Sequence, residues 1–294
     1  LLWFFHRWRP TWAFSFTALR SMFAFGSNLF ISGLIETIFF NLHLIVIGKM
    51  FSATDLGFYS RAKGLQGLAA KDIAVSVCRV AFPVFSSIQD EKERLKTSVR
   101  KALMTMAMIN FPLMVGLAIV AKPLVLLLLT DKWLPCVPYL QLFCVIGALL
   151  PLQEINLNVL KAQGRSDLFL WLQILKKSPV VIALIITYRW GILAIIYGQI
   201  VTGLIDYYLN SYYTERLIDY PIIMQVKDLI PSLSLAAIMG LGVYALQYVV
   251  VSKPAILLLV QIIVGITLYG LLCRIVKLSA FMDLLALIKP ILTK

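Results

Sequence analysis

The chain has 294 residues, of which 61% are hydrophobic and only 14% charged, whereas soluble domains are typically about 25% charged. This composition excludes a water-soluble protein built around a single core, and it indicates a protein that uses the lipid bilayer as solvent. The formal net charge of +13 matches the enrichment of Lys and Arg in the cytoplasmic loops of membrane proteins, so we expect no nucleic-acid partner.

Enzymatic and metal chemistry find no support in the residue pattern. The four cysteines are scattered without a CxxC pair, and His6 and His43 are the only histidines. These residues do not have the spacing of metal ligands. No Ser/His/Asp set, isolated pair of acids or phosphate-binding glycine loop is present. We therefore expect no catalytic residues, no metal and no cofactor.

The first residues, LLWFFHRWRP, run from an apolar stretch into a basic one and lack an initiator methionine. This order is the reverse of a signal peptide and is typical of the exit of a spanning helix. We interpret residues 1–21 as the end of a truncated preceding helix and a cytoplasmic linker, and we expect the chain to be a fragment.

Long apolar runs predict an all-α fold, a polytopic membrane helical bundle of about eight transmembrane helices. The predicted spans are residues 22–48, 57–86, 98–121, 135–160, 167–188, 190–213, 229–250 and 254–276. Residues 22–217 would form a six-helix C-terminal lobe, and 218–294 two additional transmembrane helices with a tail. The tail, AFMDLLALIKPILTK, has the pattern of an amphipathic helix at the membrane interface.

The distribution of basic residues predicts the orientation. If the start of the chain is cytoplasmic, sixteen Lys and Arg lie on the cytoplasmic side and five on the opposite side. Such a bias predicts that both the start of the chain and the C-terminus are cytoplasmic.

The first span places polar groups inside an apolar helix. Glu36 lies near its middle and Asn41 one turn further on. A carboxyl group at this depth must be protonated or paired. Two roles stay open: ion coupling or sugar binding, and a hydrogen bond between helices.

The second span carries basic residues on one stripe. Arg61 and Arg79 are 18 residues apart and project in nearly the same direction, with Lys71 to one side and Lys63 near the start. Since a charge facing lipid is costly, the stripe predicts a hydrated cavity that receives an anion. Arginine suits phosphate because its planar fork binds two oxygens. The alternative is that the end residues extend outward to water.

Later spans carry further candidates for binding sugar or coupling an ion. The fourth span ends with Gln153, Glu154 and Asn158. The Gln and Asn amides suit sugar hydroxyls, although this end of the helix could simply be hydrated. Asp206 in the sixth span is a candidate of the same kind. Lys176 and Lys177 lie some way inside the fifth span, before a kink expected at Pro179; cavity lining and extension to the cytoplasm remain equally open for them.

Four sequence motifs together resemble one known family. They are FGSNLF at 25–30, IGKMFSATDLGFYSRA at 47–62, RVAFPVFSSIQDE at 79–91 and LKAQGRSD at 160–167. The combination resembles the Wzx-type polysaccharide flippases of the multidrug/oligosaccharidyl-lipid/polysaccharide exporter superfamily.

The resemblance implies a second six-helix lobe followed by two extra helices, with the N-terminal lobe of the same polypeptide missing. It implies a protein of the bacterial inner membrane that flips lipid-diphosphate-linked oligosaccharides by alternating access around a basic central cavity. Lipid-linked oligosaccharide, membrane lipid and other membrane proteins of polysaccharide assembly would be its partners. It also implies that Arg61, Lys63, Lys71 and Arg79 meet the diphosphate.

Two alternatives differ in function class. An integral-membrane polymerase or ligase of the same pathway would need reactive groups on a large external loop, and the connections here are short. A cation-coupled drug exporter of the same superfamily would favour an acidic cavity, whereas the second span is basic.

Overall fold

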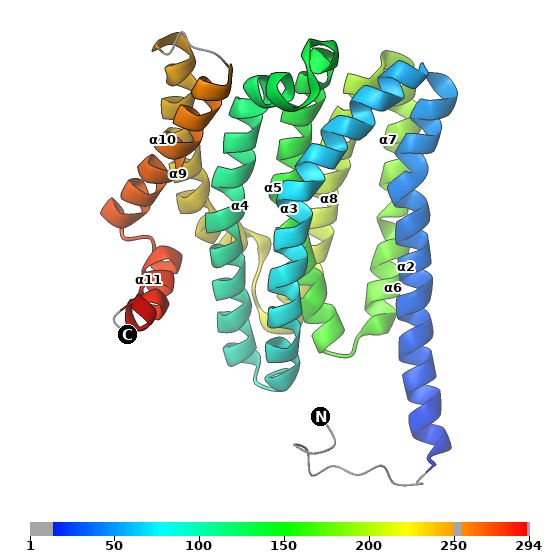
Figure 1. The fold of residues 1–294 in the computed structure, drawn as a ribbon. Helices are drawn as coiled ribbons and strands as arrows, with labels where there is room; N and C mark the ends of the chain where they lie inside the picture. Colours follow the sequence, from blue (N-terminus) through cyan, green and yellow to red (C-terminus); the bar gives the residue numbers. More distant parts are fainter. Residues whose placement is uncertain (1–13, 250–253, 293–294) are drawn as a thin grey trace.

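The structure, a computed structural model, describes residues 14–249 and 254–292. These residues form helices and short connections and contain no strand, which confirms the predicted all-α class. Figure 1 shows the arrangement, whose helices are α2 (Phe16–Met50), α3 (Ala53–Ser87), α4 (Lys92–Leu129), the 3-10 turn η1 (Asp131–Cys136), α5 (Val137–Ala162), α6 (Ser166–Leu175), α7 (Lys177–Thr187), η2 (Tyr188–Trp190), α8 (Ile192–Ile218), α9 (Ile222–Val249), α10 (Pro254–Ile275) and α11 (Ser279–Leu292).

Among the described residues, seven helical segments are long and apolar enough to cross a membrane. They correspond to the predicted spans except the second. That span is α3, a 35-residue helix in which the described stretch Val75–Ser87 is apolar but shorter than a membrane span. Of the predicted truncated helix and cytoplasmic linker, residues 1–21, the first thirteen lie outside the described residues.

The helices form three neighbouring groups (Figure 1). In the middle, α5 packs against α3, α4 and α8. On one side, α2 packs mainly against α6, and α7 against α8. On the other side, α9 and α10 pack against each other and against α4. The predicted division at residues 217 and 218 falls at the end of α8, and the domain boundaries stay a prediction.

The helix is interrupted at Lys176, between α6 and α7, close to where Pro179 predicts a kink. A proline in the first turn of a helix has no N–H to give to the carbonyl four residues earlier, which here is that of Leu175. The Ser178 hydroxyl donates to that carbonyl instead, at 3.0 Å. The single residue between the two helices is Lys176.

The short connection between α8 and α9 is held at one end of the bundle. Asp228 on α9 accepts two hydrogen bonds from the Arg100 guanidinium on α4, one of them at 2.7 Å, and a third from the Tyr220 hydroxyl at 2.8 Å. Burial, and then the hydrogen bond to Asp228, raise the pKa of Tyr220. Its hydroxyl therefore remains protonated and keeps donating.

Candidate functional site

Six ionisable side chains from four parts of the bundle form a group that we call the charge cluster. It consists of Glu36 on α2, Glu154 and Lys161 on α5, Lys176 and Lys177 at the α6–α7 junction, and Asp206 on α8. Each interacts electrostatically with at least one other: Lys176, for example, with Asp206, Glu154 and Glu36. Three carboxyl groups thus face three ammonium groups among apolar helices.

Lys176 is the central member of the charge cluster. Its side chain is only 4% exposed, although it sits midway along the α6–α7 pair. An ammonium group removed from water at this depth needs opposite charge nearby. Carboxyl groups from α2, α5 and α8 supply that charge without a direct ion pair, since none of their oxygens lies within 4.0 Å of the Lys176 nitrogen. A bound ligand or a transferred proton would therefore change the net charge around Lys176.

The carboxyl groups of the cluster differ in their surroundings. Asp206 has a buried oxygen, Oδ1, that has no hydrogen-bond partner within the part of the chain that the structure describes. Glu154 is partly buried, whereas Glu36 is exposed on α2. Buried polar atoms without partners are uncommon and frequently mark sites that bind water, ions or ligands. Asp206 is therefore the member of the cluster best placed to receive a further group.

The basic residues of α3 do not share one pocket. Arg61 lines a cavity of about 300 Å³ with Leu65 and Leu129, and its guanidinium lies 5.6 Å from the ring centre of Trp133. Lys63 instead interacts electrostatically with His43 on α2. Arg79 is exposed near the other end of α3, about 27 Å further along the helix axis.

The side chain of Lys71 lies outside the described residues. The structure thus places Arg61 and Arg79 at two levels of one long helix, as their spacing predicts. The role of the stripe in binding an anion stays a prediction.

The predicted amides serve partly as links between helices. Gln153 donates to the carbonyl of Gly203 on α8 at 2.8 Å, and Asn41 donates to the carbonyl of Thr37 within α2 at 3.0 Å. Asn158 is buried beside Cys78 of α3. Of the three, Asn41 is exposed and keeps a free acceptor oxygen for a sugar hydroxyl.

The chemistry of the cluster and stripe is ionic. Ammonium and guanidinium groups bind phosphate oxygens, and carboxyl groups bind hydroxyls or exchange protons. Within residues 14–249 and 254–292, no three His, Cys, Asp or Glu side chains come together in a way that could hold a metal ion.

Sequence reasoning missed one member of the charge cluster. Lys161 appeared to belong to a cytoplasmic loop, but it interacts with Glu154 two turns earlier on α5, while its nitrogen lies 4.7 Å from the ring centre of Phe169. The seven-residue spacing of Glu154 and Lys161 places them on one helix face and was a usable signal. Nothing in the sequence connects Glu154 to Lys176, because this electrostatic interaction joins α5 to the α6–α7 junction.

The polysaccharide biosynthesis protein family matches residues 1–138. The matched stretch is slightly less than half of the chain. The match covers the part of the chain that holds the basic stripe and the first three of the four motifs quoted above, and it confirms the predicted resemblance.

Two further proteins are similar to parts of the chain. The teichuronic acid biosynthesis protein TuaB of Bacillus subtilis (strain 168) is 31% identical over 166 residues, which are 56% of this chain and 34% of that protein. The lipopolysaccharide biosynthesis protein WzxC of Escherichia coli (strain K12) is 27% identical over 245 residues, 79% of this chain and 50% of that protein. The chain thus spans between a third and a half of the length of these relatives.

The fold of the chain is similar to that of a solved structure of the lipid II flippase MurJ in an inward closed conformation. The TM-score is 0.75, with 16% identity, over 94% of this chain and 57% of that chain. This confirms the predicted membrane-transporter fold.

Proposed function

We propose that the protein carrying this chain flips undecaprenyl-diphosphate-linked oligosaccharide repeat units across the bacterial inner membrane, for the synthesis of exopolysaccharide, lipopolysaccharide or capsule. The similarity to TuaB, WzxC and MurJ, whose names describe polysaccharide biosynthesis or lipid flipping, supports this substrate class. The predicted N-terminal lobe would complete the cavity, and lipid-linked oligosaccharide would be the main partner.

The observation that carries the proposal is the concentration of charge inside apolar helices. Ionisable residues within a membrane are costly and generally mark the path of a substrate or ion. Here the charge cluster holds six of them, and the basic stripe of α3 runs along an adjacent helix of the bundle. A substrate with a charged diphosphate and a polar sugar needs such a path, whereas a purely apolar lipid does not.

We assign the two groups different parts of the substrate. Arg61, Lys63, Lys71 and Arg79 would bind the diphosphate, successive residues taking it over as it moves along the 35-residue α3. Glu36, Asn41, Gln153, Glu154, Asn158 and Asp206 would bind sugar hydroxyls or couple transport to an ion. Alternating access would open this path first to one side of the membrane and then to the other.

Charge reversal tests the assignment of the stripe. Arg61→Glu, Lys71→Glu and Arg79→Glu would be combined in the full-length protein, and the leaflet in which lipid-linked units accumulate would be measured by their access to an external label. Hydrogen bonds to charged groups contribute about 1.5–3 kcal/mol each, so losing several should reduce flipping by roughly a hundredfold or more. Lipid-linked units would then be trapped on the cytoplasmic face.

The matched control reverses three exposed lysines that do not belong to the stripe: Lys49, Lys122 and Lys132. These changes alter net charge equally but leave the stripe intact, so flipping should continue. Normal export by the stripe variant at normal membrane abundance would refute the assignment. Accumulation of single units on the outer face would indicate a polymerase instead of a flippase.

A further inference from the structure

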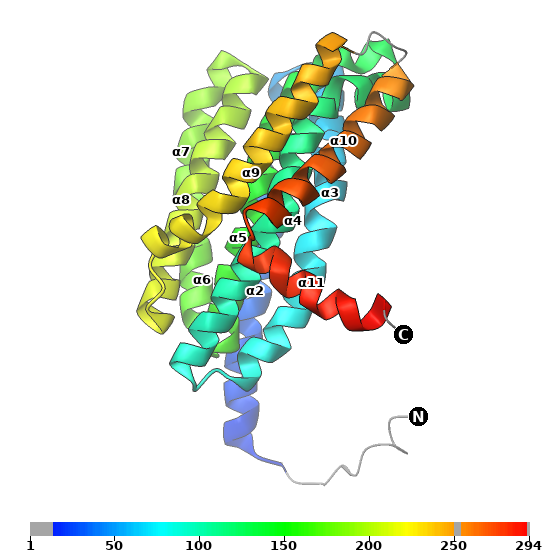
Figure 2. The same cartoon turned by 90° about the vertical axis from the view of Figure 1, so that its left-hand side faces the viewer.

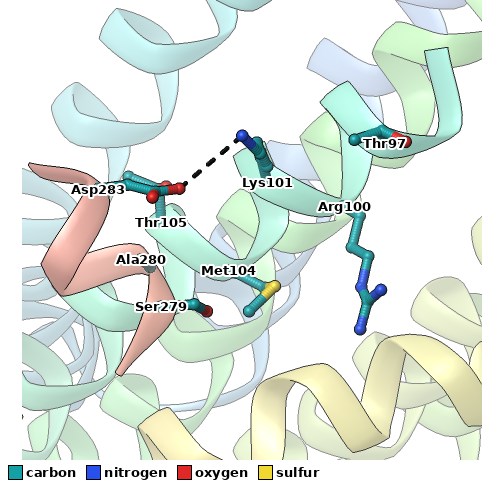
Figure 3. Close-up of a pocket in the computed structure, with 8 residues that line it drawn as sticks. All are labelled: Thr97, Arg100, Lys101, Met104, Thr105, Ser279, Ala280 and Asp283. Carbon is teal, nitrogen blue, oxygen red and sulfur yellow. Dashed lines mark ion pairs between the residues drawn. The ribbon is translucent and has the colours of Figure 1, made fainter. Parts of the chain in front are cut away.

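A second cavity lies between α4 and α11, away from the charge cluster. It measures about 290 Å³, close to the lower end of the roughly 300–1,000 Å³ typical of small-molecule sites. Figure 3 shows its lining, which comes from one face of α4 and the first turns of α11: Thr97, Arg100, Lys101, Met104, Thr105, Ser279, Ala280 and Asp283.

The position of α11 places this cavity at the membrane surface. The helix follows directly after α10, a membrane span, and turns away from the direction of the spans (Figure 2). Its apolar side contacts α4 and α10 through Ala280, Phe281 and Leu284. A strongly amphipathic helix in this place lies at the level of lipid headgroups. The occupant available to the cavity is therefore a membrane lipid.

Two cations and one anion line the cavity, namely Arg100, Lys101 and Asp283. The Arg100 guanidinium extends toward α9, where Asp228 already binds it through two hydrogen bonds (Figure 3). The Lys101 nitrogen and an Asp283 oxygen are 3.9 Å apart, too far for a hydrogen bond, and both side chains are more than 60% exposed. Each of these two groups therefore has hydrogen-bonding capacity left for a ligand.

We propose that this cavity binds the headgroup of a zwitterionic phospholipid that carries a phosphate diester and a primary ammonium group, as phosphatidylethanolamine does. The Lys101 ammonium would bind the phosphate, and the Asp283 carboxylate would accept hydrogen bonds from the lipid ammonium. Thr105 and Ser279 hydroxyls can donate to the phosphate oxygens. Met104 and Ala280 offer apolar contact to the glycerol and the first methylene groups. The proposal does not depend on the proposed flipping activity.

Charge complementarity favours this headgroup over an anionic one. A phosphatidylglycerol headgroup would pair its phosphate with Lys101 but has no cationic group to balance the Asp283 carboxylate. A phosphatidylcholine headgroup has the same charges as the proposed ligand, but its trimethylammonium group has no N–H to donate to Asp283. Comparison of phosphatidylethanolamine with phosphatidylglycerol therefore tests the charge match, and comparison with phosphatidylcholine tests the hydrogen bond to Asp283.

The test measures lipid binding to the full-length protein, purified in mild detergent, by native mass spectrometry with short-chain lipids. We expect phosphatidylethanolamine to bind more tightly than phosphatidylcholine or phosphatidylglycerol. Lys101→Gln with Asp283→Asn should weaken binding of phosphatidylethanolamine roughly tenfold, because two charge-assisted hydrogen bonds are lost. Asp283→Asn alone should abolish the preference for phosphatidylethanolamine over phosphatidylglycerol, which is a change that loss of folding cannot produce.

The control pair is Lys92 and Asp219, which form an exposed ion pair of 2.6 Å at the same end of the bundle but do not line the cavity. The hydrogen bond from Lys92 lowers the pKa of Asp219, so the Asp219 carboxyl group is ionised at neutral pH. Lys92→Gln with Asp219→Asn should leave lipid binding unchanged. Equal binding of all three lipids, or equal effects of the two double variants, would overturn the proposal. Binding of soluble glycerophosphoethanolamine as tight as that of the lipid would also overturn it.

Discussion

Gln225 on α9 and Asn156 on α5 exchange two side-chain hydrogen bonds. Asn156 Nδ2 donates to Gln225 Oε1 at 3.1 Å, and Gln225 Nε2 donates to Asn156 Oδ1 at 3.2 Å. The same Gln225 oxygen also accepts from the hydroxyls of Tyr207 and Ser211 on α8. Gln225 is 0% exposed, so the first helix beyond the predicted six-helix lobe is joined to that lobe by a buried, paired network.

Replacing Gln225 by leucine should destabilise the protein by about 2 kcal/mol, because the polar groups of Asn156, Tyr207 and Ser211 would lose their partner while remaining buried. Thermal unfolding in detergent measures the loss. Gln141→Leu is the control, since Gln141 is exposed and donates a single hydrogen bond, to the Ala118 carbonyl at 3.1 Å. Losses of equal size in the two variants would show that the network does not stabilise the contact between α9 and the lobe.

The close packing of α9 on α4 depends on Gly240. A methyl group added there would lie 2.6 Å from Cγ1 of Val115 and 3.0 Å from Cδ1 of Ile119. Val115 is stiff because it is β-branched, so Gly240→Ala should push the helices apart and cost about 1–3 kcal/mol. Gly270→Ala, on α10, meets no atom within 4 Å and should be neutral or slightly stabilising. Comparison of the two melting temperatures checks this prediction, and a tolerated Gly240→Ala would contradict it.

Thr130, between α4 and η1, has φ 83° and ψ 170°, a backbone conformation that is essentially restricted to glycine. Thr130→Gly should therefore raise the melting temperature, by an amount equivalent to about 1 kcal/mol. Thr130→Ala removes the same side chain but keeps the strain, so it separates the two effects. If alanine stabilises the protein as much as glycine, the backbone is not the cause.

The charge cluster predicts a coupling between Lys176 and Asp206. Asp206→Asn removes one of the charges that balance the buried ammonium and should destabilise the protein by roughly 2 kcal/mol. Lys176→Met in the same chain removes the need for that charge and should restore most of the loss. Flipping should fail in both the single and the double variant. The double variant regains stability, but it still lacks the ionisable groups of Lys176 and Asp206. Thermal unfolding together with the leaflet assay measures both quantities; additive effects on stability would exclude the coupling.

The sequence predicts individual helices better than the relations between them. Apolar runs predict the spans, and the amphipathic pattern of the tail predicts α11. Pro179 predicts the helix interruption near Lys176. All these signals are local to one helix. Helical spacing also predicts the common direction of Arg61 and Arg79. The charge cluster depends on contacts between α2, α5, α7 and α8, and no local pattern specifies which helices meet. The Gln225 network was missed for the same reason.

The helix interruption at Lys176 lies between two different packing contacts. After it α7 packs on α8, and before it α6 packs on α2. A pivot at this point would swing α2 together with α6 while α7 stayed with α8. Glu36 would then move relative to Asp206, and the balance between these two carboxyl groups around Lys176 would change with the movement.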